Sequence, residues 1–139
     1  MKRRTIVALL LLTIMLASIS TAIAYSDPTK IANLPYSSNF NFKRSVFTAY
    51  SFDLAKSSIS ITLTNLKLSI NRDATLKANS YYYGSSGSWI LKDTDSVAFN
   101  GTASNRYMTL NTVAGRIHCV RFSKTDYTDY LASAVFTIE

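Results

Sequence analysis

His118 and Cys119 are the only histidine and the only cysteine of this chain. They are neighbours in an apolar segment, IHCVRF, that reads as a strand, and adjacent strand residues point to opposite faces. They therefore cannot form a thiolate-imidazole pair with each other, and one histidine cannot build a metal site with several histidine ligands. No Gly-x-Ser-x-Gly motif and no glycine-rich phosphate loop occurs. We expect no catalytic residue, no cofactor and a non-enzymatic protein.

Acidic residues form two close pairs, Asp93 with Asp95 and Asp126 with Asp129. Aspartates at alternate loop positions can turn two oxygens toward a calcium ion. Turn formation is the simpler interpretation, because aspartate caps its own backbone in turns. The only glutamate is Glu139, which argues against paired-carboxylate glycoside hydrolysis.

Aromatic side chains carry the strongest functional signal. Tyr81, Tyr82 and Tyr83 precede a Gly84–Gly87 loop (GSSG), and Trp89 follows it, which predicts a hairpin with Tyr81 and Tyr83 on one face and Tyr82 on the other. Such rings can stack on sugars or anchor a protein partner. The alternative is that Trp89 and two of the tyrosines are cross-strand packing pairs.

A second aromatic candidate lies near the C-terminus. Tyr127 and Tyr130 occupy the polar segment SKTDYTDY, which we expect to be a loop. Loops at one end of a β-sandwich commonly carry binding residues.

The elements that must position these residues are strands, because apolar and polar residues alternate with period two along much of the chain. Seven to nine short strands predict an all-β, antiparallel β-sandwich, jelly-roll or Ig-like, or a partly closed barrel. We expect one domain over residues 39–139, preceded by an extended leader over residues 25–38.

Two segments interrupt the alternation. The apolar phase slips by one between Leu63 and Leu66, which requires either a bulge at Thr64 and Asn65 or a tight connection between two strands; two strands are preferred. The segment KDTDS, residues 92–96, reads as a turn after a return strand that starts near Trp89.

Residues 1–24 have the pattern of a secretory signal peptide. Lys2, Arg3 and Arg4 precede the apolar run TIVALLLLTIMLASI, and Ala22 and Ala24 place small residues before a cleavage point at Tyr25. An uncleaved anchor is the alternative. We expect a secreted, extracellular protein, loosely surface-associated at most, with no membrane span after cleavage.

Charge and cysteine usage limit the partners. Without the three basic residues of the signal peptide, 12 basic residues face 8 acids, so the net charge falls from +7 to about +4. The basic residues are scattered, which argues against nucleic acid. The charge is compatible with an anionic envelope polymer or lipid surface, or with ordinary solubility. A lone cysteine excludes an intramolecular disulfide; a buried, inert Cys119 is favoured over a reactive thiol or an intermolecular disulfide.

The last third of the chain, from VAFNG to the C-terminus, resembles the end of bacterial secreted β-sandwiches of the prepeptidase C-terminal type. In that outline a glycine precedes a strand of the type Tyr-Tyr-Val-Arg-Val, a polar loop follows, and one strand closes the domain. The matching residues are Gly115, Val120, Arg121 and Phe122, whereas Ile117, His118 and Cys119 depart from the pattern. The resemblance implies a β-sandwich and little about function.

Three hypotheses for function remain. The first is a secreted binding or cell-envelope module that recognises an envelope glycan or a surface protein through the aromatic residues. The second is a bacteriocin-like or inhibitory effector, against which no amphipathic helix is seen. The third is an unrecognised hydrolase.

Overall fold

Alternation of inward apolar and outward polar side chains forms ten strands in the part of the chain that the structure describes. A computed structural model describes residues 26–139, so the predicted signal peptide and its cleavage point between Ala24 and Tyr25 lie outside the described residues. The strands are β1 (Ile31–Ala32), β2 (Tyr36–Phe42), β3 (Ser45–Phe47), β4 (Ser51–Leu54), β5 (Ser58–Leu68), β6 (Ala74–Tyr83), β7 (Trp89–Phe99), β8 (Ser104–Asn111), β9 (Arg116–Ser123) and β10 (Ala132–Ile138). Over residues 26–139, no helix is long and apolar enough to cross a membrane.

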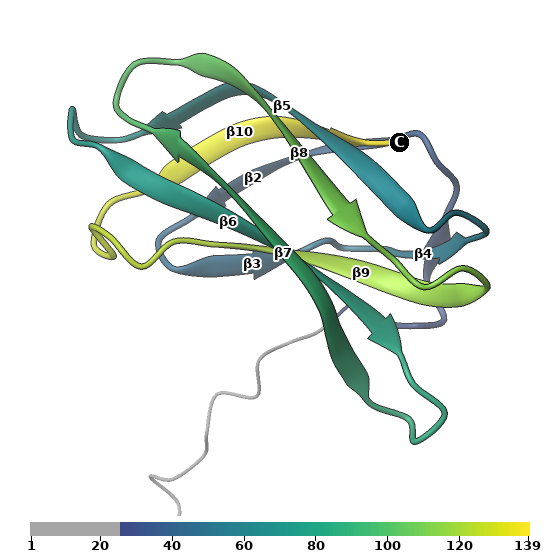
Figure 1. Cartoon of the computed structure of the whole chain (residues 1–139). Helices are drawn as coiled ribbons and strands as arrows, with labels where there is room; N and C mark the ends of the chain where they lie inside the picture. The colour runs from purple at the N-terminus through teal and green to yellow at the C-terminus, as the bar shows by residue number, and fades with distance from the viewer. Residues whose placement is uncertain (1–25) are drawn as a thin grey trace, which may run out of the picture.

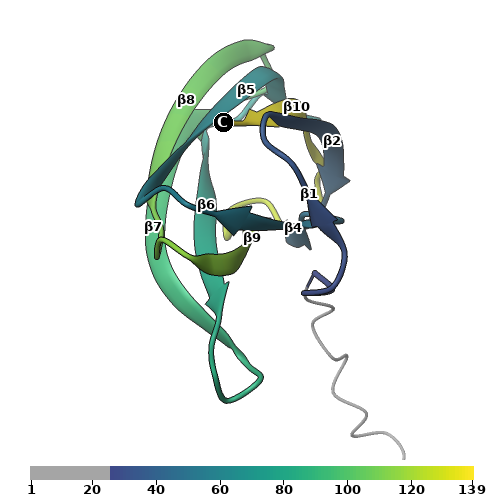
Figure 2. The same cartoon turned by 90° about the vertical axis from the view of Figure 1, so that its right-hand side faces the viewer.

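The strands build two facing sheets, which confirms the predicted sandwich (Figure 1). One sheet has the order β1-β4-β9-β6-β7, with β3 also paired to β9, and the other has the order β2-β10-β5-β8. All pairings are antiparallel except β1 with β4. The chain changes sheet at most connections, as in a jelly roll, and the end-on view shows β7 and β8 meeting along one side (Figure 2).

The space between the sheets is filled by aromatic and branched aliphatic side chains. Phe40 of β2 lies 4.9 Å from Phe122 of β9, and Phe122 lies 5.1 Å from Phe136 of β10, measured between ring centroids. These rings join both sheets at offset angles that aromatic pairs favour. Since no disulfide is available, burial of these side chains is what holds the sheets together.

The N-terminal segment differs from the predicted leader. Ile31 and Ala32 pair with β4, and β2 starts at Tyr36, so the expected boundary at residues 38 and 39 falls inside a strand. Pro35 stands just before β2, where its missing amide costs no ladder hydrogen bond. The Tyr36 ring packs 5.3 Å from the Phe52 ring, which places this residue in the sandwich.

Residues 58–68 form one strand with a bulge, so the preference for two strands was wrong. Thr64 of β5 lies opposite Val135 of β10, but Lys67 lies opposite Ser133, which leaves one extra residue on β5. Asn65 takes a positive φ of 56° within this bulge. Because of the extra residue, the apolar side chains before and after the bulge face the same side of the sheet. Leu63 and Leu66 are both completely buried.

The predicted turn at residues 92–96 is also wrong, because β7 runs without a break from Trp89 to Phe99. Ser80 of β6 lies opposite Asp93, whereas Tyr81 lies opposite Leu91, so Lys92 is an extra residue in a second bulge. The aspartates are strand residues here because their carboxylates bind the neighbouring strand β8, as described below.

We predict that the bulge depends on the residue at position 65. Asn65→Val should lower the free energy of unfolding by about 1–2 kcal/mol, because a β-branched residue is strained at positive φ. Asn65→Gly should stay within about 0.5 kcal/mol of the parent chain, because glycine adopts this φ freely. Urea denaturation measures both, with Ser60→Val on the exposed face of β5 as the control. Equal stability of the valine and glycine variants would contradict the assignment.

Candidate functional site

The β6–β7 hairpin projects beyond the rest of its sheet (Figures 1 and 2). Its turn is closed by hydrogen bonds from the Gly84 amide to the Ser88 carbonyl, at 2.9 Å, and from the Gly87 amide to the Gly84 carbonyl, at 3.1 Å. Gly87 has a φ of 76°, which other residues rarely adopt. The loop predicted from the GSSG segment is therefore confirmed and ties the two ends of the hairpin together.

Tyr81, Tyr83 and Trp89 share the outer face of this hairpin, and we call them the aromatic surface. Tyr83 lies directly opposite Trp89, with ring centroids 5.3 Å apart in an edge-to-face arrangement. Tyr81 lies opposite Leu91, which is 52% exposed. The Tyr83 and Trp89 pair is a cross-strand packing pair, as the alternative interpretation proposed, yet both side chains remain half-buried rather than buried.

Tyr82 faces the other way, as the alternation predicts. It lies opposite Ile90 and His118, and its ring centroid is 6.2 Å from that of His118. Tyr82 therefore packs toward the interior and does not join the aromatic surface.

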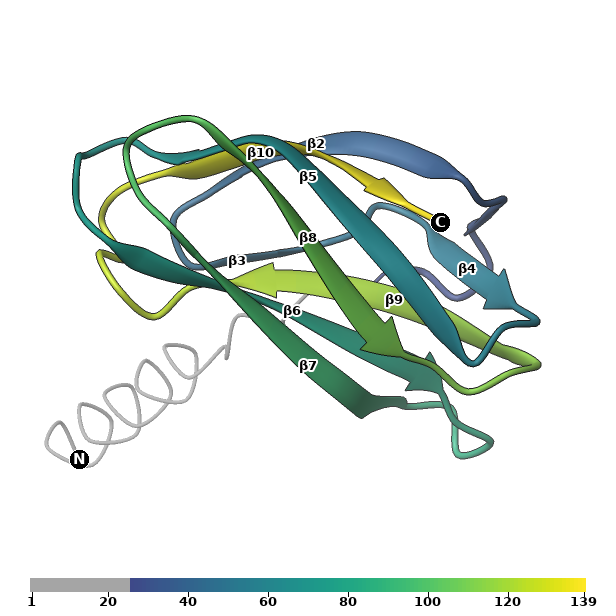
Figure 3. The same ribbon diagram turned by 45° about the horizontal axis from the view of Figure 1, so that its top comes forward.

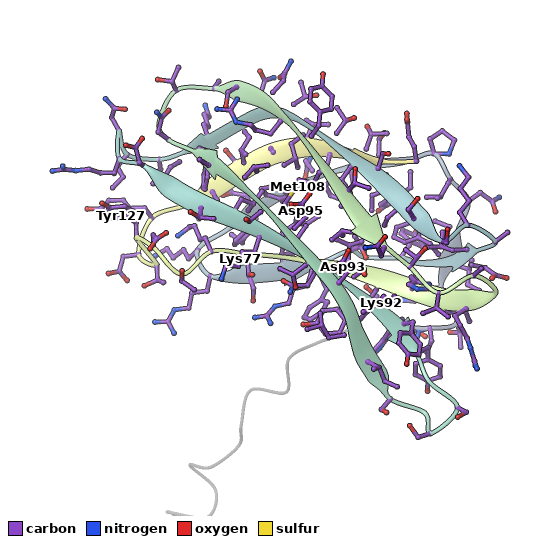
Figure 4. The ribbon with its side chains drawn as sticks, viewed as in Figure 1. Lys77, Lys92, Asp93, Asp95, Met108 and Tyr127 are labelled. Carbon is purple, nitrogen blue, oxygen red and sulfur yellow. The ribbon has the colours of Figure 1, made fainter. Side chains whose placement is uncertain are left out.

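Tyr127 and Tyr130 lie in the loop between β9 and β10, at the opposite end of the sandwich from the hairpin (Figure 4). The loop is organised around Lys124, whose buried Nζ donates hydrogen bonds to the carbonyls of Asp126 and Tyr127. The two tyrosines are exposed by 41% and 43%. The structure does not bring them together with the aromatic surface.

Asp93 and Asp95 accept hydrogen bonds from the other sheet. Oδ2 of Asp93 accepts a hydrogen bond from the Asn111 amide at 2.7 Å, and Oδ2 of Asp95 accepts one from the Thr109 amide at 2.9 Å. Both amides belong to β8, the outermost strand of its sheet, and Figure 4 shows the two aspartates between β7 and β8. The carboxylates thus cover a sheet edge that would otherwise present free donors.

The acidic pairs have polar or charged partners within the protein. The hydrogen bond from the Asn111 amide holds the pKa of Asp93 below its usual value. Asp126 and Asp129 favour the charged form of Lys124, although burial lowers the pKa of that amine overall. Within residues 26–139, no group of three or more histidine, cysteine, aspartate or glutamate residues could hold a metal ion.

His118 is fully buried, and both of its ring nitrogens have hydrogen-bond partners. Its Nε2 accepts a bond from the Val113 amide at 2.9 Å, so the proton of the neutral ring resides on Nδ1, which lies 3.0 Å from the Arg116 carbonyl oxygen. Burial lowers the pKa of His118. A ring in this position is unavailable as a general base for an external substrate.

Cys119 is completely buried on the outer side of its sheet, near Ser26 of the N-terminal segment. Burial raises the pKa of the thiol to about 12. The thiol is therefore protonated and inaccessible, which confirms the inert interpretation and contradicts the reactive one.

Sequence reasoning missed two residues beside the aromatic surface. Phe47 of β3 packs with its ring centroid 6.0 Å from that of Tyr81, and Arg121 of β9 places its guanidinium carbon 5.6 Å from the Phe47 ring centroid. The sequence places Arg121 in a strand, but only the sheet order shows that β3 and β9 lie beside the hairpin.

Known proteins resemble this chain in architecture and not in sequence. No protein-family model matches the chain, and no curated protein matches its sequence. The CBM22-1 xylan-binding domain of Paenibacillus barcinonensis Xyn10C is similar in structure, with 14% identity, 64% of this chain and 62% of that domain covered, and a TM-score of 0.48. The chain thus spans less than two thirds of that domain.

Two further solved structures are similar at the same level. The CBM36-1 domain of a xylanase from the hindgut metagenome of Trinervitermes trinervoides has 14% identity, with 80% of this chain and 90% of that one covered and a TM-score of 0.48. A cellulose-specific CBM28 module has 10% identity, with 75% and 70% covered and a TM-score of 0.49. At these identities the likeness concerns the sandwich alone and assigns no ligand.

The three structures named above are carbohydrate-binding modules, so the prepeptidase C-terminal family suggested by the last third of the sequence finds no support among them. The features that carried that resemblance are ones that many sandwiches share. Gly115 has a φ of 74°, and β9, a polar loop and β10 follow it. They describe strand order rather than specific chemistry.

We predict that the Asp93 and Asp95 pair stabilises the β8 edge and binds no calcium. Replacing both with alanine should lower the free energy of unfolding by roughly 1 kcal/mol per lost hydrogen bond, since water competes at this edge. Replacing both with asparagine should cost less, because an acceptor oxygen remains. The control is Ser96→Ala on the outer face of β7. A rise in the melting temperature of the parent chain in millimolar calcium would contradict this assignment.

A second prediction concerns pH. Because the folded state lowers the pKa of His118 below its usual 6.5, the unfolded state binds more protons as pH falls through that value. The free energy of unfolding should therefore be lower at about pH 5.5 than at about pH 7.5. His118→Gln keeps a neutral acceptor. Its free energy of unfolding, measured by urea denaturation, should fall less between these two pH values. An unchanged drop would show that His118 is not responsible.

Proposed function

We propose that this chain is a non-catalytic module that binds glycans through the aromatic surface of the β6–β7 hairpin. The observation that carries the proposal is the edge-to-face pair of Tyr83 and Trp89, held beside Tyr81 on the outer face of a projecting hairpin. Aromatic side chains with a polar tip combine apolar contact area with hydrogen bonding.

The hairpin backbone that carries these rings is ordered before any ligand binds. The ladder between β6 and β7 continues to the last pair, Tyr83 with Trp89, and the turn hydrogen bonds close it. A ligand therefore does not need to order the hairpin backbone on binding, which preserves affinity.

Polar groups next to the aromatic surface suit a hydroxylated ligand. Asn79 and Thr94 lie on the same outer face, and the Asn79 amide donates to the Thr94 hydroxyl at 2.7 Å. A few placed polar groups beside apolar contacts are typical of specific ligand sites.

The pattern of residues 1–24 supports a place of action outside the cell, where such polymers occur. The internal position of His118 supports a binding role rather than hydrolysis.

Isothermal titration and affinity electrophoresis against a panel of polysaccharides test the proposal. Trp89→Ala and Tyr83→Ala should each weaken binding about tenfold, because one ring contributes on the order of 1 kcal/mol or more. The Tyr81→Ala, Tyr83→Ala, Trp89→Ala triple variant should abolish it, with folding checked by circular dichroism.

Tyr107→Ala is the matched control, since this tyrosine is 72% exposed on β8 of the other sheet. It should change affinity less than twofold. Unchanged binding by the folded triple variant would refute the proposal. So would loss of binding in a Tyr127→Ala, Tyr130→Ala variant with the hairpin variants unaffected.

A further inference from the structure

Two cations extend the aromatic surface along the outer face of the same sheet. Lys77 of β6 is exposed and lies opposite Ser96 of β7 and Ser123 of β9. Arg121 of β9 lies opposite Asn79 of β6. At about 3.4 Å per residue, the stretch of β6 from Lys77 to Tyr83 covers roughly 20 Å. We call this stretch, with Arg121 beside it, the cationic face.

Arg121 lies against an aromatic side chain of the same face. Its guanidinium carbon lies 5.6 Å from the Phe47 ring centroid, and Phe47 contacts Tyr81, so the cation is continuous with the aromatic surface. Its Nε is buried and has no hydrogen-bond partner within the described part of the chain. Because Nε itself is buried, a ligand on this face would bind the other guanidinium nitrogens of the half-buried Arg121 side chain.

Carboxylates are turned away from this face. The extra residue Lys92 reverses the side-chain phase of β7, so Asp93 and Asp95 point to the interior side and bind β8. In the view of Figure 4, Lys77 lies on one side of the β7 ribbon and the two aspartates lie on the other. No acid occupies the outward positions of β6, of the β9 residues paired with it, or of the facing residues of β7.

Acids occur at the borders of the face. The Oδ2 atom of Asp126 lies 3.4 Å from the Thr75 amide nitrogen. Asp126 also favours the charged form of Lys124. Asp53 lies on β4, opposite Ile117. Neither lies opposite Lys77 or Arg121 in the strand register.

We infer that the glycan is an anionic polysaccharide. Its sugar rings contact Tyr81, Tyr83 and Trp89, and its carboxylate or phosphate groups bind Arg121 and Lys77. This inference rests on the proposed function and adds the class of ligand. An extended polymer with repeated charges fits the face, because the cations are separated from Trp89 by several residues of β6. Arginine suits this role because its donors match the geometry of carboxylate and phosphate.

The test compares one polymer in charged and neutral form. Polygalacturonate and its fully methyl-esterified form share a backbone and differ in charge, and a poly(glycerol phosphate) chain provides the phosphate. The parent protein should bind a charged polymer at least tenfold more tightly than the ester, with a preference that declines as salt rises.

Lys77→Gln and Arg121→Gln should each reduce that preference several-fold and leave binding to the ester unchanged. Lys67→Gln, which removes an exposed cation of β5 in the other sheet, is the matched control and should change nothing. Lys77 is exposed, so its variant remains informative if Arg121→Gln fails to fold.

The outcomes separate the two proposals. Equal affinity for charged and neutral polymers, with binding still lost in the Trp89→Ala variant, overturns the anionic ligand and retains glycan binding. Absence of binding to every polymer overturns both. Tight binding to poly(glycerol phosphate), which has no sugar rings, with weak binding to polygalacturonate would show that charge alone directs binding and would overturn the polysaccharide assignment.

Discussion

The fold depends on keeping every second side chain of each strand inside the sandwich. No disulfide supports the domain, so the apolar layer between the sheets must be continuous. Strands as long as β5 and β7 lose this alignment when the sequence phase slips. A bulge in each strand absorbs the slip, and the one at Asn65 allows Leu63 and Leu66 to be buried together.

The bulge at Lys92 gives the two sides of β7 different properties. Before it, Trp89 and Leu91 face outward with Tyr83 and Tyr81; after it, Asp93 and Asp95 turn toward β8. One added residue thus supplies acceptors to the edge of one sheet and removes negative charge from the outer face of the other. Closure of the sandwich and the charge of the candidate site have the same local cause.

Features that depend on alternation and turn chemistry could be predicted from the sequence. Sequence reasoning predicted the sandwich, the Gly84–Gly87 hairpin loop, the shared face of Tyr81 and Tyr83, and the burial of Cys119. It misassigned residues 92–96 because aspartates typical of turns here bind a neighbouring strand. It could not place Phe47 and Arg121 beside the hairpin, since sheet order depends on contacts between residues far apart in the chain.

The position of β10 affects how the domain is made. This strand, Ala132–Ile138, is the last one along the chain, yet it lies between β2 and β5 inside its sheet (Figure 3). Until it arrives, β2 has no neighbour in that sheet and the interior remains open on one side. The pairing of β2 in this sheet therefore has to wait until β10, far from it in the sequence, is available. Folding should be slow for the size of the domain, as expected when loop closure must precede strand pairing.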